Sequence, residues 1–229
     1  MKLFRCSGLA DLIGSPKGKG ELITATAKSS IRAIVKEDLY GFRSFKGNLA
    51  TRKGNQLEDM AIDLSGRVRQ RQYKKHEGRV NTEIITGECD ILDLNNLEIG
   101  DTKCTWDIGS HPFFQDEAQE KVKKAGYDIQ LHGYFLAYEE DYLKKHGKEI
   151  RFERGFIDFW LFPCPVELTK DWDDREQLID MVENIPIQER LTTVIIERND
   201  SIINRIKEQV PHCQDYYQKL MREREDAKN

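Results

Sequence analysis

Residues 85–103, ITGECDILDLNNLEIGDTK, decide the fold that we predict for this chain. Residues 82–93 are rich in Ile and Thr, as strands are. Asn95 and Asn96 then signal a turn, because asparagine tolerates a positive φ. Residues 97–106 show the pattern of the returning strand. We therefore predict a β-hairpin closed by Asn95-Asn96.

The carboxylates of this hairpin are the first candidate site. If the loop is the two residues Asn95-Asn96, paired residue numbers sum to 191, so that Asp90 lies opposite Asp101. Cross-strand Cβ atoms are about 4.5–5.5 Å apart, and two facing carboxylates destabilise a sheet unless something lies between them. A divalent cation such as Mg²⁺, which prefers oxygen ligands, is the obvious candidate.

Lys103 shares the face of Asp101, because side chains alternate along a strand. Its ammonium would stand beside a metal-bound water and a phosphate under attack. Three alternatives stay open from the residues alone: a three-residue loop would shift the pairing, Glu88 would pair with Lys103 as a plain salt bridge, and the hairpin charges would simply be solvated.

The rest of the chain predicts helices around this hairpin. Helical spacing of apolar residues covers 29–40 and 48–72, and a longer helix is expected over 116–145, after a loop at 107–115. An aromatic run at 151–162 predicts a buried strand. The pattern is helical from Asp173 onward, and the last segment, 201–227, is charged and amphipathic. This order predicts an α/β sandwich with a small mixed sheet.

Composition agrees with a globular protein of one domain, or one domain with appended helices. The chain has 229 residues, of which 38% are hydrophobic and 33% charged. The net charge of −4 does not by itself indicate nucleic acid, although a local basic patch would be enough for it. No apolar stretch approaches the length of a membrane span.

The cysteines argue against a zinc ribbon. There are five, and no two of them form a C-x-x-C pair. Their odd number, with no secretory signal at residues 1–20, predicts reduced thiols in a cytoplasm.

Four short motifs together resemble the PD-(D/E)XK nuclease superfamily, in its group of phage lambda-type exonucleases and RecB-like nucleases. Gly87-Glu88-Cys89-Asp90 resembles the Gly-x-x-Asp strand, and Asp101-Thr102-Lys103 resembles the Asp/Glu-x-Lys strand. Glu58 stands on a preceding helix, and Gln130 and Tyr134 match a Gln-x-x-x-Tyr motif on a following one, where residues four apart share a face. The resemblance covers residues 3–162.

The resemblance implies a fold and a metal site. The expected fold is α/β, with a restriction-endonuclease-like core, a small mixed β-sheet flanked by helices, and appended C-terminal helices. Glu58, Asp90, Asp101 and the carbonyl of Thr102 would bind one or two Mg²⁺ ions, which Mn²⁺ could replace. Lys103 would assist the attacking water. Gln130 and Tyr134 would support the site or touch DNA, unless they are only a polar stripe beside the core.

Two sets of residues are candidates for binding DNA. Residues 5–13 resemble the opening of lambda-type exonucleases, where an Arg and a Ser grip the terminal phosphate. Ser7 fits that pattern better than Arg5, and it would otherwise cap a first helix. A basic run follows Glu58 and is a candidate for contacts with the DNA backbone, unless it is a solvated face: Arg67, Arg69, Arg71, Lys74, Lys75 and Arg79. From this run we take Arg67, Arg71, Lys74 and Lys75 as DNA-binding candidates.

The function implied is a Mg²⁺-dependent exonuclease of linear double-stranded DNA, working 5′ to 3′ in phage-type recombination in a host cytoplasm. We expect a single-strand annealing protein as partner, assembly into a homo-oligomer and no association with a membrane. Residues 1–165 would form the nuclease core with an N-terminal helical segment, and 166–229 a helical extension of the same domain. Alternatives are an endonuclease on this fold, a non-catalytic DNA-binding or assembly protein, or an unrelated protein with coincidental motifs. No iron–sulfur cluster is expected, because only Cys164 and Cys213 lie near the C-terminus.

Overall fold

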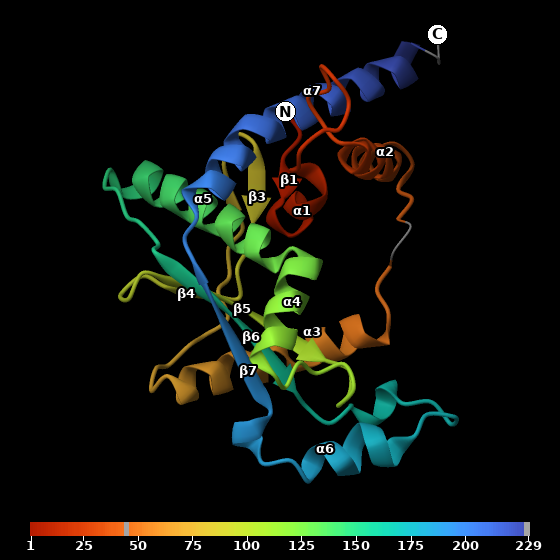
Figure 1. The fold of residues 1–229 in the computed structure, drawn as a ribbon, viewed down its shortest axis with the longest axis vertical. Helices are drawn as coiled ribbons and strands as arrows, with labels where there is room; N and C mark the ends of the chain where they lie inside the picture. The colour runs from red at the N-terminus through yellow and green to blue at the C-terminus, as the bar shows by residue number, and fades with distance from the viewer. Residues whose placement is uncertain (44–45, 227–229) are drawn as a thin grey trace.

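The computed structural model of the chain describes residues 1–43 and 46–226 (Figure 1). Residue 227, the predicted end of the last helical segment, lies outside the described residues. Four strands form the main sheet, in the spatial order β4 (Ile91–Asp93), β5 (Glu98–Thr105), β6 (Arg154–Leu161) and β7 (Leu191–Glu197). Strands β5 and β6 are parallel, and the other two pairs are antiparallel.

A second, smaller sheet lies beside the main one. Its order is β1 (Phe4–Arg5), β3 (Ile85–Gly87) and β2 (Val80–Asn81), with β1 parallel and β2 antiparallel to β3. Both sheets are mixed and flanked by helices, which confirms the predicted α/β class. The strands are, however, divided between two sheets and not gathered into one.

The predicted hairpin register is confirmed. Ile91 pairs with Gly100 and Asp93 with Glu98, so each pair sums to 191. The loop spans residues 94–97 instead of two residues, and its positive φ of 50° falls on Leu97, not on an asparagine. The side chain of Asp93 closes this loop, because its Oδ1 accepts hydrogen bonds from the backbone of both Asn95 and Asn96.

The prediction of one strand over residues 82–93 is wrong. The chain leaves the smaller sheet after Gly87 and enters the main sheet at Ile91. At the break, the carboxylate of Asp90 accepts the backbone N–H of Thr102 at 2.6 Å. A side chain therefore occupies the position that a backbone carbonyl would take in a continued ladder.

The helix α3 (Leu49–Val68) covers one face of the main sheet. Asn48, the predicted start, is its N-cap and forms a capping box with Thr51, whereas the helix ends at Val68, short of the predicted end at Gln72. Its inner side packs Ala61 against Trp160, whose indole N–H donates to Ser65 Oγ at 2.9 Å.

The opposite face is covered by α4 (Gln115–Ala125) and α5 (Tyr127–His146), which replace the single helix predicted over 116–145. Gly126 separates them in the left-handed conformation, with φ of 70°. A Cβ built on Gly126 would lie 2.2 Å from the Cβ of Ala10. The bend thus lets the short helix α1 (Leu9–Leu12) pack closely against α5.

The prediction of helix from Asp173 onward is wrong at residues 191–197. This run of β-branched residues forms β7, which pairs with β6. Short helical segments precede it: η2 (Val166–Leu168), η3 (Glu176–Asp180), α6 (Met181–Glu183) and η4 (Ile187–Glu189).

The long helix α7 (Asp200–Asp226) packs on α2 (Ala25–Tyr40) and α5, and Figure 1 shows it crossing the end of the molecule opposite α6. The 3-10 turn η1 (Cys6–Gly8) joins β1 to α1 and contacts α5. No helix in residues 1–43 and 46–226 combines the length and apolar character needed to cross a membrane.

Candidate active site

The candidate site forms where β5 loses its neighbour. Strand β4 pairs only with residues 98–100 of β5, so the edge from Asp101 to Thr105 has no strand beside it within the described ranges. The N–H of Thr102 points to this edge, where it meets Asp90. Because the N–H and C=O of one strand residue point to the same side, the Thr102 carbonyl also faces the open edge beside Asp90.

Asp101 lies on the face of β5 that is covered by α5. It is 2% exposed, and its Oδ1 accepts a hydrogen bond from Gln130 Nε2 at 3.4 Å. Gln130 also donates to Tyr134 Oη at 2.8 Å. The structure thus brings together the predicted residues Asp101, Gln130 and Tyr134, joined in one hydrogen-bonded chain.

Lys103 lies on the same face of the strand, as alternation predicted. Its ammonium forms an ion pair with Asp101 Oδ2 and stands 4.9 Å from the centre of the Tyr127 ring. Burial would lower the pKa of Lys103, but the nearby carboxylates of Asp101 and Asp90 outweigh burial and raise it. The lysine is therefore charged, and 26% of its side chain remains exposed to solvent.

Asp90 has an unusual pKa for a carboxyl group. Burial, and secondarily the charge of Asp101, raise the pKa of Asp90 to about 6, against the opposing effects of Lys103 and the hydrogen bonds from Thr102. The carboxylates of Asp90 and Asp101 therefore repel each other, although Asp90 lies just before β4 and outside the paired register. Such a concentration of negative charge in a poorly solvated place favours a cation.

Glu58 enters from α3, on the other side of the sheet. Its carboxylate forms an ion pair with Lys75, and this contact raises the pKa of Lys75. The alternative in which Glu88 pairs with Lys103 is wrong, because Glu88 pairs with Arg79 at 3.2 Å instead.

The donors around this edge suit a hard divalent cation. All are oxygens, and the buried Oδ2 of Asp101 has the Lys103 ammonium as its partner in the described part of the chain. Across the same residues, no three His, Cys, Asp or Glu side chains already surround a common point as a metal centre. Two of the carboxylates are instead held by lysines, Glu58 by Lys75 and Asp101 by Lys103.

The N-terminal candidates lie in a separate cleft of about 530 Å³. Arg5 and Ser7 line this cleft together with Arg43 and Thr86. The side chains of Arg5 and Ser7 are exposed. Ser7 does not cap a helix: Gly8 occupies the N-cap position of α1, without any side-chain hydrogen bond. The cleft is linked to the candidate site through β3, since Arg5 pairs with Thr86, four residues before Asp90.

The predicted basic run is divided among several partners. Arg67 pairs with Asp63 on the surface of α3, and Lys74 is exposed. Arg71 forms ion pairs with Glu98 and Asp93, which tie the end of α3 to the hairpin. The run therefore does not present one continuous cationic stripe.

Two structural charges were not identified from the sequence. Lys53 is fully buried on α3, where its ammonium donates to the carbonyls of Trp106 at 2.7 Å and Phe162 at 2.5 Å. Arg69 makes a bidentate ion pair with the buried Asp158 of β6. Both fasten the helix that carries Glu58 to the sheet that carries Asp101. Neither has a signal in the sequence, because each pair joins residues at least 50 positions apart.

Comparison with known proteins places this geometry in a family. A phage-related exonuclease from Haemophilus somnus 129PT is 48% identical, over 97% of this chain and 96% of that chain, with a TM-score of 0.89. An alkaline exonuclease, LHK-Exo from Laribacter hongkongensis, shares the fold at 16% identity and a TM-score of 0.55, over 99% of this chain and 94% of that one. Its complex with dAMP gives 17% identity, a TM-score of 0.58 and the same coverage of 99% and 94%. No family model matches the chain, and no curated protein does.

Proposed function

Because the chain belongs to the phage-related exonucleases, we propose that it is a metal-dependent nuclease that degrades linear double-stranded DNA from its ends. The proposal extends to a 5′ to 3′ direction and a role in phage-type recombination. The observation that carries it is the grouping of Asp90, Asp101 and Lys103 at the open edge of β5.

The acidic residues and one carbonyl would hold the metal. Glu58, Asp90, Asp101 and the Thr102 carbonyl offer oxygen ligands, and Oδ2 of Asp101 would exchange the Lys103 ammonium for the metal ion. Mg²⁺, or Mn²⁺ in its place, would polarise the phosphate and lower the pKa of a bound water.

The remaining residues orient and stabilise the reacting groups. Lys103 is charged and partly exposed beside Asp101, so its ammonium can orient the attacking water and stabilise negative charge on the phosphoryl oxygens. Gln130 fixes Asp101 Oδ1, and Tyr134 in turn fixes Gln130. These two are positioning residues, which keep the carboxylate in one orientation.

The cleft at the N-terminus would receive the end of the DNA. Arg5 and Ser7 supply a cation and a hydroxyl there, which suits a terminal phosphate. Lys74 and Arg67 remain candidates for backbone contacts. The proposal also includes a single-strand annealing protein as partner, assembly into a homo-oligomer, location in a host cytoplasm and no iron–sulfur cluster. In it, residues 1–165 form the nuclease core and residues 166–229 a helical extension of the same domain.

The test compares linear and circular double-stranded DNA, with Mg²⁺ or with EDTA, using the wild type and Lys103→Ala. We expect linear DNA to be degraded only with Mg²⁺, circles to survive, and the variant to lose at least about 100-fold in rate. End labels on either strand report the direction. Cleavage of circles would make the protein an endonuclease, and binding without cleavage would make it a DNA-binding or assembly protein.

A further inference from the structure

The connector between α3 and β2 is held against the candidate site. Residues 74–79, KKHEGR, run past the break between β3 and β4. The backbone N–H of His76 donates to the carbonyl of Asp90 at 2.8 Å. Gly78 N–H donates to Glu88 Oε1 at 3.1 Å, and Arg79 pairs with the same carboxylate. Lys75 therefore leaves a backbone that is anchored at Asp90 and, further along, at Glu88.

Lys75 uses this position to reach back to α3. Its ammonium contacts Glu58 Oε2, so that one of the expected metal ligands is paired with a cation from the chain itself. Glu58 is more enclosed than its partner, with 26% of its side chain exposed against 47% for Lys75. The lysine is thus the more solvent-exposed member of the pair.

We infer that Lys75 is an internal counter-ion, which occupies Glu58 in the metal-free protein and competes with a divalent cation for this carboxylate. This inference rests on the proposed function, because Glu58 must be a metal ligand for the competition to matter. Engaging a metal at Glu58 requires that the ion pair with Lys75 opens.

The expected effect follows from the charges. The positive charge of Lys75 repels a divalent ion. Removing this charge therefore removes the repulsion and frees the carboxylate of Glu58. The pair is partly exposed, so water screens it and the effect is moderate. We expect Lys75→Gln to bind Mn²⁺ and Mg²⁺ about tenfold more tightly than the wild type.

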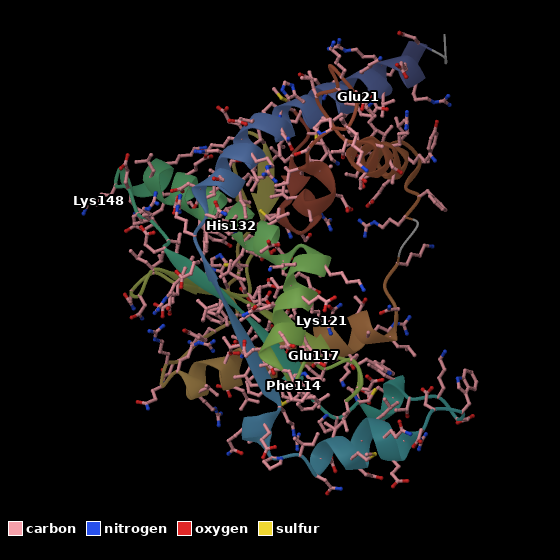
Figure 2. The ribbon with its side chains drawn as sticks, viewed as in Figure 1. Glu21, Phe114, Glu117, Lys121, His132 and Lys148 are labelled. Atoms are coloured by element: carbon pink, nitrogen blue, oxygen red, sulfur yellow. The ribbon has the colours of Figure 1, made fainter. Side chains whose placement is uncertain are left out.

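The experiment measures the binding of each metal alone, without DNA, by titration calorimetry on the full chain. Lys75→Arg keeps the charge and should bind like the wild type. Lys148→Gln removes the same charge at the outer edge of the molecule (Figure 2) and should change the affinity by less than about twofold. Glu58→Gln removes the ligand and should weaken binding. Thermal melting of each variant without metal verifies that it is folded.

A double variant decides whether Lys75 acts through Glu58. In the Glu58→Gln background, Lys75→Gln should no longer tighten binding. If tightening persists there, or if Lys75→Gln alone leaves the affinity unchanged or weaker, the inference is wrong. The DNA assay separates this failure from that of the proposed function: a wild type that degrades linear DNA with Mg²⁺ keeps the function even then. Absence of both metal binding and degradation in the wild type and Lys75→Gln would overturn both.

Discussion

Replacing Arg69 with methionine should destabilise the fold severely, although arginine in a basic run is ordinarily a surface residue. The guanidinium donates to both carboxylate oxygens of Asp158, at 2.8 and 2.9 Å, and lies 3.8 Å from the centre of the Phe156 ring. Asp158 is fully buried, and its other hydrogen bond comes from the hydroxyl of Thr193 at 2.6 Å. Methionine fills part of the space but leaves this carboxylate without a counter-charge.

Removing one partner of a buried ion pair costs about 3–5 kcal/mol, because a charge remains in a poorly solvated place. That is a large share of the roughly 5–15 kcal/mol by which domains are stable. Urea unfolding followed by tryptophan fluorescence measures the loss, since Trp160 is buried on the same strand. Adding Asp158→Asn to Arg69→Met removes the unpaired charge and should recover about half of the lost free energy of unfolding.

Arg67→Met is the matched control, two residues earlier on the same helix. Its side chain is 72% exposed and pairs with Asp63 on the surface, so the change should cost no more than about 0.5 kcal/mol. A loss below about 1 kcal/mol for Arg69→Met would refute the reasoning, because the carboxylate of Asp158 would then be stable without its partner. An equal loss in both variants would attribute the effect to the helix and not to the buried pair.

Two further predictions concern stability. Gly126→Ala should lower the free energy of unfolding in urea by about 2–4 kcal/mol, because φ is 70° and the new Cβ would lie 2.2 Å from Ala10. The control Gly147→Ala, at φ 63° with nothing within 4 Å of the new Cβ, should lower it by only about 1 kcal/mol. Equal losses would show that the contact with Ala10 does not matter. Burial, and secondarily the charges of Lys121 and Lys53, lower the pKa of His111 from 6.5 to about 4. The neutral ring therefore contributes about 3 kcal/mol of stability above pH 6.5, and this contribution is lost as the pH falls toward 4. Unfolding at pH 7 and pH 5 should show a smaller decline for His111→Gln than for the wild type, and parallel declines would contradict the assignment.

The site was predicted as far as it depends on local pattern. The alternation along 98–105 set Asp101 and Lys103 on one face, and the symmetry of the hairpin set the register of 91–93 against 98–100, which is the same whether the loop has two residues or four. Helix spacing set Gln130 and Tyr134 on one face, and they do meet. Each of these relations spans few residues, so side-chain periodicity is enough to predict it.

Partners distant in the chain could not be predicted in this way. The basic run after Glu58 is one feature in the sequence, yet the fold sends Arg69 to buried Asp158, Arg71 to the hairpin and Lys75 back to Glu58. The choice among them depends on which carboxylate each element brings within reach.

The sequence by itself determined the hairpin, its register and which candidate site residues share a face, because these follow from alternation and helical spacing. Only the tertiary structure decided that residues 82–93 divide between two sheets, that β7 completes the main sheet, and that Gly126 bends the helices over it. Those outcomes depend on packing between segments far apart in the chain. A local run such as 191–197 carries the propensity for a strand, but it becomes one only where β6 offers an edge to pair with.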